Sequence, residues 1–144
     1  MALTMSYTTN AGTTHANSYW VITDIDMFKK LQNSTDLMRQ SLGLADDERP
    51  EVAAPARDTT TGYYLHITVC GWKTATSRSN GDKPIAIVYR YPTKHPTWFY
   101  VMDEHVENAL GDCEWDLSSE TNMLNAAYTF LKTTNFFSNA SDST

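Results

Sequence analysis

Acidic and histidine side chains are the groups in this 144-residue chain whose spacing best suits chemistry. Asp24 and Asp26 lie two residues apart in a β-prone run, so both point to the same side of a strand and could serve a cation or an acid–base pair. The simpler interpretation, which we favour, is a pair of solvated acids on an edge strand. Asp103, Glu104 and His105 form a polar cluster just after another β-prone run. Because no second histidine or cysteine stands at ligand spacing, we expect a loop there.

The other candidate nucleophiles and bases stand alone. Cys113 has no basic neighbour in the sequence that would activate its thiol, and His66 is expected to be a half-buried strand residue. Cys70 and Cys113 make no disulfide framework, so we expect two buried or half-buried free thiols. The chain contains no Gly-rich phosphate cradle and no G-x-S-x-G, H-E-x-x-H or C-x-x-C motif. The sequence therefore predicts no catalytic residue, no cofactor and no metal site.

The strongest structural signal is Asn80-Gly81, which stands between two β-prone runs. A type I′ turn needs positive φ at both central positions, and these residues tolerate it. The pattern predicts one long β-hairpin over 62–91, with Trp72 opposite Tyr89. Its expected buried face comprises Cys70, Trp72, Thr74, Thr76, Ile85, Ile87, Tyr89 and Tyr91. Leu65, Ile67 and Val69 have the opposite parity, so the strand is either covered on both sides or reset by a bulge at Gly71, which we favour.

The elements before the hairpin are predicted from composition and periodicity. Residues 1–16 are rich in Thr, Asn, Gly and Ala and should form an extended arm. Residues 17–27 alternate as a strand does, and 28–44 show helical spacing, with a shorter helix from Ser34 as the alternative. Residues 45–62 are acidic and interrupted by proline, which predicts an exposed loop.

After the hairpin, residues 97–102 form a third, aromatic β run, and 103–115 are typical of a short helix ending at Gly111. Ser118 or Ser119 can cap a further helix over 118–133. Its amphipathic stripe would consist of Met123, Ala126, Ala127, Phe130 and Leu131. The expected fold class is α+β, mainly β: an antiparallel sheet built on the hairpin, with the C-terminal helix packed on it, in a single domain covering 1–144.

Composition limits the partners of the chain. The net charge of −6 argues against nucleic acid, because binding to a phosphate backbone needs clustered Lys and Arg. No segment approaches the roughly 20 apolar residues of a membrane span, and we see no secretory signal. We therefore expect a soluble, cytoplasmic setting. Only 19% of residues are charged while 12% are aromatic, a profile that suits a surface buried against partners.

The aromatic residues of the predicted strands exceed what one face of a small sheet covers. One interpretation is a thick core beneath the C-terminal helix. The other is a sheet that packs on an identical subunit or another protein, because Trp and Tyr are enriched where surfaces are buried on association. The interface candidates are Tyr19, Trp20, Trp72, Tyr89, Tyr91, Trp98 and Tyr100.

Two terminal segments carry a resemblance. The first runs from Tyr7-Thr8-Thr9-Asn10 to Asn17-Ser18-Tyr19, and the second runs from Ala127-Tyr128 through Leu131-Lys132-Thr133 to Phe137, Ala140 and Asp142. They resemble small structural proteins of tailed bacteriophages, which open with a Thr-rich arm and an Asn-x-Tyr segment and close with a pattern like A-Y-x-x-L-K-T-x-x-x-F-x-x-A-x-D. The segment 28–61 is longer than in that group, and Asn135 replaces its usual proline.

The resemblance implies a non-enzymatic virion component, made in the host bacterial cytoplasm and assembled into a homo-oligomer such as a trimer or hexamer. Within the virion it implies a tail, neck or fibre-attachment adaptor whose partners are other virion proteins. A capsid cement or decoration protein is the close alternative, since it would also be small, β-rich, acidic and oligomeric. The third possibility is a host-acting phage protein or small enzyme that uses the acids near His105. The resemblance implies no catalytic residue.

Overall fold

The computed structural model describes residues 1–28, 63–90, 102–107 and 109–143. Its elements are β1 (Ala2–Thr8), β2 (Thr14–Phe28), β3 (Tyr63–Trp72), α2 (Ala75–Ser79), β4 (Ala86–Tyr89), β5 (His105–Glu107), β6 (Cys113–Trp115), α3 (Met123–Thr133) and β7 (Ser141–Ser143). The helix expected over 28–44, the loop over 45–62 and the β run over 97–102 lie outside the described residues, except for Phe28 and Met102.

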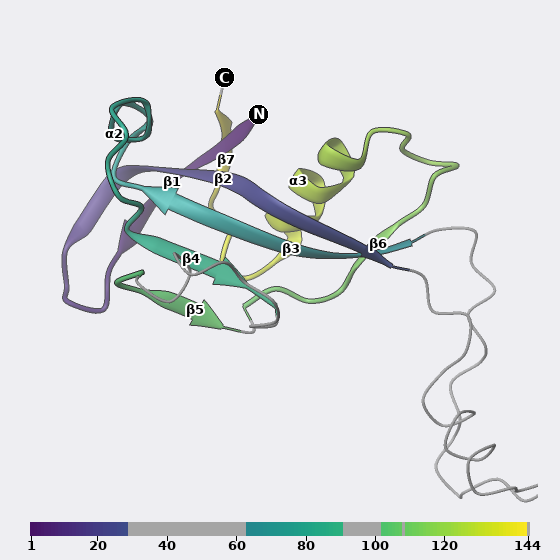
Figure 1. Ribbon diagram of the computed structural model, residues 1–144, viewed down its shortest axis with the longest axis horizontal. Helices are drawn as coiled ribbons and strands as arrows, with labels where there is room; N and C mark the ends of the chain where they lie inside the picture. Colours follow the sequence, from purple (N-terminus) through teal and green to yellow (C-terminus); the bar gives the residue numbers. More distant parts are fainter. Residues whose placement is uncertain (29–62, 91–101, 108, 144) are drawn as a thin grey trace, which may run out of the picture.

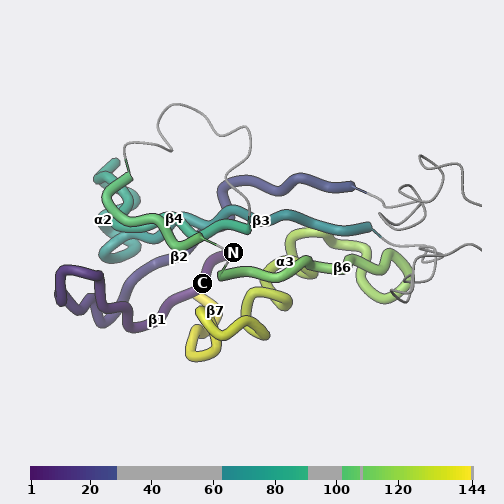
Figure 2. Tube along the Cα trace, turned by 90° about the horizontal axis from the view of Figure 1, so that it is seen from below, coloured from purple at the N-terminus to yellow at the C-terminus, as the bar shows by residue number. Residues whose placement is uncertain are grey.

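The strands form one sheet in the order β5-β4-β3-β2-β1-β7, and β6 pairs with β3 beside this path. Every described pairing is antiparallel apart from that of β4 with β5. The ribbon of β2 and β3 runs along the length of the sheet (Figure 1), and α3 and β7 lie on one side of this ribbon (Figure 2). The prediction of a mainly β chain with an antiparallel-dominated sheet and a C-terminal helix is confirmed.

The β2–β3 pairing is the longest in the sheet, starting where Tyr19 faces Trp72 and continuing to the end of β2. The β-branched and aromatic side chains of both strands favour this extended conformation. The strand predicted over 17–27 lies within β2. Thr23 is skipped in the register, so it is the extra residue of a β-bulge.

Residues 1–16 do not form an extended arm, so that prediction is wrong. They contain β1, which pairs with β2 on one side and β7 on the other. Leu3 and Met5 are buried, and Tyr7 packs against the same core. These residues have the two-residue spacing of a strand with one buried face. The Thr- and Gly-containing turn that follows obscured this alternation.

β3 and β4 are antiparallel neighbours, but the predicted two-residue turn and its register are wrong. Gly71 pairs with Ala86, and Tyr89 pairs with Thr68 rather than with Trp72. The connection between the strands contains α2. A tight hairpin would pair the residues that directly flank a two-residue turn. Here α2 separates the two strands, so the pairing begins farther from Asn80-Gly81 and the register differs.

Local signals explain why α2 forms. The side chain of Thr74 caps the helix by accepting the N–H of Ser77 at 3.0 Å. At the other end Asn80 is the C-cap and Gly81 has φ of 80°, while the N–H of Asp82 bonds back to the carbonyl of Ser77. This is the geometry that glycine favours after a helix. Asn80-Gly81 thus ends a helix, and Thr74 is exposed instead of joining the predicted buried face.

The sheet carries buried side chains on both faces. The main core contains Leu3, Trp20, Leu65, Ile67, Val69, Val88, Leu131 and Phe137, among others. A smaller cluster contains Cys70, Ile87, Tyr89 and Met102, with Trp72 packed against it. Because Val69 and Cys70 alternate between the two clusters, the strand is covered on both sides. The bulge favoured at Gly71 is wrong, since the pairing there is regular on both sides of β3.

The C-terminal helix α3 begins at Met123, later than the predicted 118. Asn122 caps it, with its side chain accepting the N–H groups of Leu124 and Asn125. Ser118 instead donates to the carboxylate of Asp116 in the preceding turn, which keeps it out of the helix. The buried helix residues are Ala127, Tyr128 and Leu131, whereas the predicted stripe members Met123, Ala126 and Phe130 are half-buried.

The short helix predicted over 103–115 is wrong. That stretch contains β5, in which Val106 pairs with Val88, and β6, in which Trp115 pairs with Tyr63. Pairing with strands distant in the sequence overrides the weak helical pattern there, because β structure depends on cross-strand contacts more than on local preference.

Candidate functional site

Register places a set of aromatic side chains on the sheet face opposite the main core. Tyr19 faces Trp72, Phe28 faces Tyr64 and Thr68 faces Tyr89. All of these residues lie on one side of the sheet, because the bulge at Thr23 shifts the alternation of β2 by one residue. We call this the aromatic face, defined by Tyr19, Phe28, Tyr64, Trp72 and Tyr89. The rings of Phe28 and Tyr64 are stacked with centroids 5.7 Å apart. Asp24 and Asp26 belong to the same face and are exposed, as expected of solvated acids.

The structure divides the predicted interface residues. Trp20 lies in the main core and is 0% exposed, and Tyr89 is 4% exposed, so neither is available to a partner and these two predictions are wrong. Trp20 points into the main core, and Tyr89 packs in the smaller cluster with Cys70, Ile87 and Met102. Tyr19 and Trp72 are half-buried on the aromatic face. Tyr91, Trp98 and Tyr100 lie outside the described residues.

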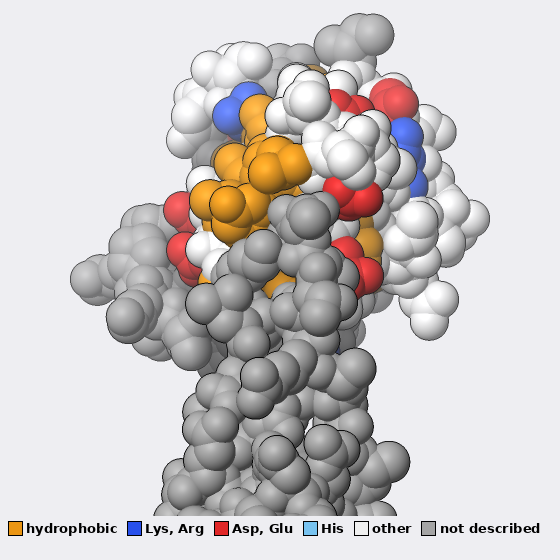
Figure 3. All heavy atoms as spheres, turned by 90° about the vertical axis from the view of Figure 1, so that its right-hand side faces the viewer, with side chains coloured by type: hydrophobic (Ala, Val, Ile, Leu, Met, Phe, Trp, Pro, Cys, Tyr) orange, Lys and Arg blue, Asp and Glu red, His pale blue; other side chains and the backbone are white. Residues whose placement is uncertain are grey.

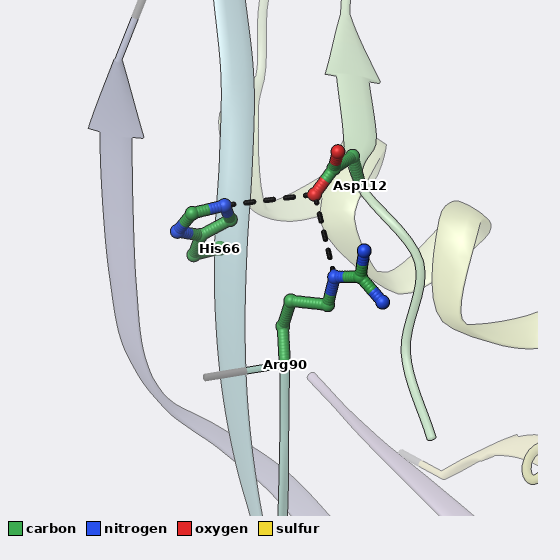
Figure 4. Close-up of polar contacts among 3 residues, drawn as sticks. All are labelled: His66, Arg90 and Asp112. Carbon is green, nitrogen blue, oxygen red and sulfur yellow. Dashed lines mark ion pairs between the residues drawn. The ribbon is translucent and has the colours of Figure 1, made fainter. Parts of the chain in front are cut away.

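His66, Arg90 and Asp112 converge beside the aromatic face (Figure 4). Asp112 Oδ1 lies 3.6 Å from His66 Nε2 and 3.6 Å from Arg90 Nε. β4 and β6 both pair with β3, at its later and earlier residues respectively, so His66 falls between them. Arg90 follows β4 and Asp112 precedes β6. Only this nonlocal pairing brings the three together, and no local sequence signal pointed to Arg90 or Asp112.

The geometry of this cluster is that of an ion-paired joint between strands. A separation of 3.6 Å exceeds the 2.7–3.2 Å of a hydrogen bond, so Asp112 attracts the Arg90 guanidinium without a directional bond, and it attracts His66 in the same way when that ring is protonated. The three side chains are 27–33% exposed, where solvent screens such pairs. The His66 ring also lies 4.5 Å from that of Phe28. Burial raises the pKa of the neighbouring Cys113 thiol to about 11, so it is protonated at neutral pH and a poor nucleophile.

The polar cluster at 103–105 separates in space. Asp103 pairs with Lys83 Nζ at 2.9 Å, and His105 is exposed with its ring 5.9 Å from that of Tyr89. Glu104 instead points inward and is 9% exposed. Tyr7 donates its hydroxyl to Glu104, and the N–H of Asn10 lies 3.2 Å from its second oxygen. The expected loop thus contains a buried carboxylate that joins the β1–β2 turn to the segment before β5.

Burial and the bond to Glu104 together raise the pKa of Tyr7 above its ordinary value. The hydroxyl therefore stays protonated and keeps donating to the carboxylate. Burial likewise raises the pKa of the Cys70 thiol to about 11. Both effects favour the neutral form of the group, which suits structural roles.

Three large apolar side chains are exposed near the end of β2, after β6 and at the start of α3. Met27 in β2 is 52% exposed, Leu117 after β6 is 38% exposed, and Leu124 in the first turn of α3 is 46% exposed. We call these three residues the apolar end. Figure 3 shows hydrophobic side chains collected on this side of the molecule, with acidic side chains around them. A contiguous exposed apolar patch bordered by polar groups is typical of a protein contact. Sequence reasoning missed all three residues, because Met27 and Leu124 stand near the ends of their elements and Leu117 lies in a turn.

Within the described ranges, no group of three or more His, Cys, Asp or Glu side chains is placed to hold a metal ion. Neither described helix has the length and apolar character needed to cross a membrane. The chain matches no family model, no curated protein and no solved structure.

Proposed function

We propose that this chain is a non-enzymatic structural component of a tailed-bacteriophage virion. It would act as an oligomeric adaptor in the tail, neck or fibre-attachment apparatus, with copies of itself and other virion proteins as its partners. The observation that carries the proposal is the apolar end. Met27, Leu117 and Leu124 are large apolar side chains that β2, the turn after β6 and α3 leave exposed to water. Covering them against a neighbouring subunit removes that exposure.

The energy of covering the apolar end is large enough to matter. Full burial of a Leu or Met side chain contributes roughly 1.5–3 kcal/mol, so burying the exposed remainder of each contributes on the order of 1 kcal/mol. Three such side chains together change an association constant by about a hundredfold. Nearby acids then select the partner, because charge at a rim favours the complementary surface.

The terminal segments that resemble phage structural proteins have structural roles here, which supports the proposal. Leu131 and Phe137 lie in the main core. Tyr128 donates its hydroxyl to the carbonyl of Met1 and accepts the N–H of Ile22, so it links α3 to β1 and β2. Lys132 pairs with Asp142 at 2.9 Å. We include in the proposal an α3 packed on the sheet through these residues, as the scaffold that presents the apolar end.

The experiment compares the oligomeric mass of the full chain with that of Leu124→Asp by sedimentation equilibrium. The wild type is expected to form a defined oligomer of the 16.2 kDa chain, and Leu124→Asp a smaller species. Thr129→Asp, an exposed position of the same helix, is the matched control and should keep the wild-type mass. A wild type that stays monomeric at all concentrations would contradict the proposal. Cryo-electron microscopy of the assembled virion then separates an adaptor from a capsid cement protein.

A further inference from the structure

Asn80-Gly81, the one Asn-Gly dipeptide of the sequence, combines two features that favour a reaction of the chain with itself. Asn80 is exposed, and Gly81 has no Cβ that would hinder the approach of its backbone nitrogen to the Asn80 side chain. Attack of this nitrogen on Asn80 Cγ closes a five-membered succinimide. The side-chain nitrogen leaves as ammonia and takes the proton of the Gly81 N–H. Water then cleaves one of the two ring C–N bonds, which leaves aspartate or isoaspartate at position 80.

The folded structure holds this dipeptide in an unreactive geometry. Asn80 has φ of −76° and ψ of −7°, which is close to helical. The succinimide ring requires Asn80 Cβ and the Gly81 nitrogen to lie nearly eclipsed about the Cα–C bond, and this ψ sets them well apart. The Gly81 N–H also donates to the carbonyl of Arg78 at 3.0 Å, which fixes its direction. The nitrogen therefore reaches attack distance only after this hydrogen bond breaks and ψ of Asn80 rotates.

Few interactions hold α2 closed, so this rotation needs only a local opening of the chain. None of the helix residues is buried. The described contacts are the Thr74 cap, the hydrogen bonds from Gly81 and Asp82 back to α2, and the bond from Trp72 Nε1 to the carbonyl of Asp82 at 2.9 Å. Segments with few buried apolar contacts open at a much smaller free energy than the whole domain unfolds. We therefore expect α2 to open while the sheet stays intact.

We propose that Asn80 is a site of spontaneous deamidation that is gated by the opening of α2. The rate in the folded chain is the rate of the open segment multiplied by the fraction of chains in which α2 is open. The product adds one negative charge to the exposed connection between β3 and β4. Isoaspartate also inserts a methylene group into the backbone, so the hydrogen bonds from Gly81 and Asp82 cannot both re-form, and the opening becomes irreversible. This site is independent of the proposed function.

Peptide mapping of the full chain during incubation at neutral pH tests the site. Trypsin cleaves after Arg78, so mass spectrometry of the peptide that begins at Ser79 measures the deamidated fraction of Asn80. Digestion in ¹⁸O water marks any deamidation that occurs during handling. We expect the folded chain to form both products about tenfold to a hundredfold more slowly than the same chain unfolded in guanidinium chloride. Equal rates in the two states, or an Asn80 that stays intact on the hundredfold slower timescale, would overturn the proposal.

Variants of two neighbouring threonines separate the gating from the reactivity of the dipeptide. Thr74→Ala removes the helix cap, so it should raise the open fraction of α2 and speed deamidation of the folded chain about fivefold. Thr76→Ala is the matched control, because it keeps the cap and adds a better helix former, and its rate should stay the same or fall slightly. Both side chains are exposed, so both variants should keep the wild-type circular dichroism spectrum and react as fast as the wild type in guanidinium chloride. A folded-state rate in Thr74→Ala equal to that of the wild type would overturn the gating by α2.

Discussion

The two faces of the β2–β3 ribbon differ in how they use the same residue types. On the core face Trp20 is fully buried, and its Nε1 donates to Ser18 Oγ, which in turn donates to the carbonyl of Met5. On the aromatic face Trp72 stays half-buried under Arg78. The first tryptophan is enclosed by the subunit, and the second keeps part of its ring exposed. The face to which each residue points therefore decides which tryptophan is enclosed and which stays partly exposed.

The largest expected effect contrasts the two tryptophans. Trp20→Ala should lower the free energy of unfolding by about 3–5 kcal/mol, because it opens a cavity in the main core. Trp72→Ala should lower it by roughly 1 kcal/mol, since the ring is only half-buried. Urea denaturation followed by circular dichroism measures both. Equal losses of unfolding free energy would show that the two faces contribute alike to stability, and would contradict the difference described above.

Gly71 provides a second test of the difference between the two faces, because it lies against Trp20 in the main core. A Cβ at this position would stand 2.6 Å from ring carbons of Trp20, closer than packed atoms approach. Gly71→Ala should therefore cost about 1–3 kcal/mol in the same denaturation assay. Gly111→Ala is the matched control, since its Cβ would lie 3.9 Å from Phe130, and it should change stability by less than about 0.5 kcal/mol. An unchanged free energy of unfolding in Gly71→Ala would show that Trp20 can shift to make room for the added Cβ.

The hydrogen bond between Tyr7 and Glu104 is a polar interaction made by a residue that packs against the main core. Tyr7→Phe removes the hydroxyl that a nearly buried carboxylate accepts, and should cost about 1–3 kcal/mol at neutral pH. Tyr19→Phe, at a half-buried tyrosine of the aromatic face, should be nearly neutral. Thermal unfolding of both variants provides the test, and equal effects would contradict a special role for the bond to Glu104.

The raised pKa of Tyr7 predicts a pH dependence. The folded-state pKa lies above the unfolded value of about 10, so the contribution to stability is complete below pH ~10. It is lost as the pH rises above that value, where the unfolded chain ionises first. Tyr7→Phe should therefore lose less stability than the wild type between neutral pH and pH ~11. Parallel curves for the two proteins would rule out this linkage.

The smallest effect belongs to the ion-paired joint. Asp112→Asn should cost less than about 1 kcal/mol, because its pairs with His66 and Arg90 are long and partly exposed. The loss should shrink further in high salt, as screening weakens the wild-type pairs. Glu114→Gln, an exposed acid of the adjoining strand, is the control. A loss of several kcal/mol, unaffected by salt, would instead indicate a tightly coupled buried network.

The parts of the fold that could be predicted are those with strong local patterns. The β2 strand and the antiparallel relation of β3 to β4 follow from β-branched and aromatic runs. The turn between β3 and β4 was mispredicted because Asn80-Gly81 suits a helix end as well as a hairpin, and the cap at Thr74 favours the helix. The strand β1 was missed because its alternation spans only Leu3, Met5 and Tyr7.

The candidate sites were harder to predict, because they depend on pairings between distant segments. His66 and Asp112 meet only once β6 pairs with β3, and Glu104 is buried only because the β1–β2 turn reaches it. The high aromatic content of the sequence predicted an interface. Which of the rings is enclosed depends on the sheet face to which each residue points. Trp20 and Tyr19 are neighbours in the sequence and lie on opposite faces.

The central claim is that the chain works by burying its apolar end against other subunits, and oxidative footprinting of Met27 tests it most directly. Met27 is 52% exposed in the subunit, so peroxide should oxidise it readily in dilute, dissociated protein. At concentrations where the chain assembles, its oxidation should slow several-fold as a neighbour covers it. Oxidation at the same rate in dilute and assembled protein would contradict the account.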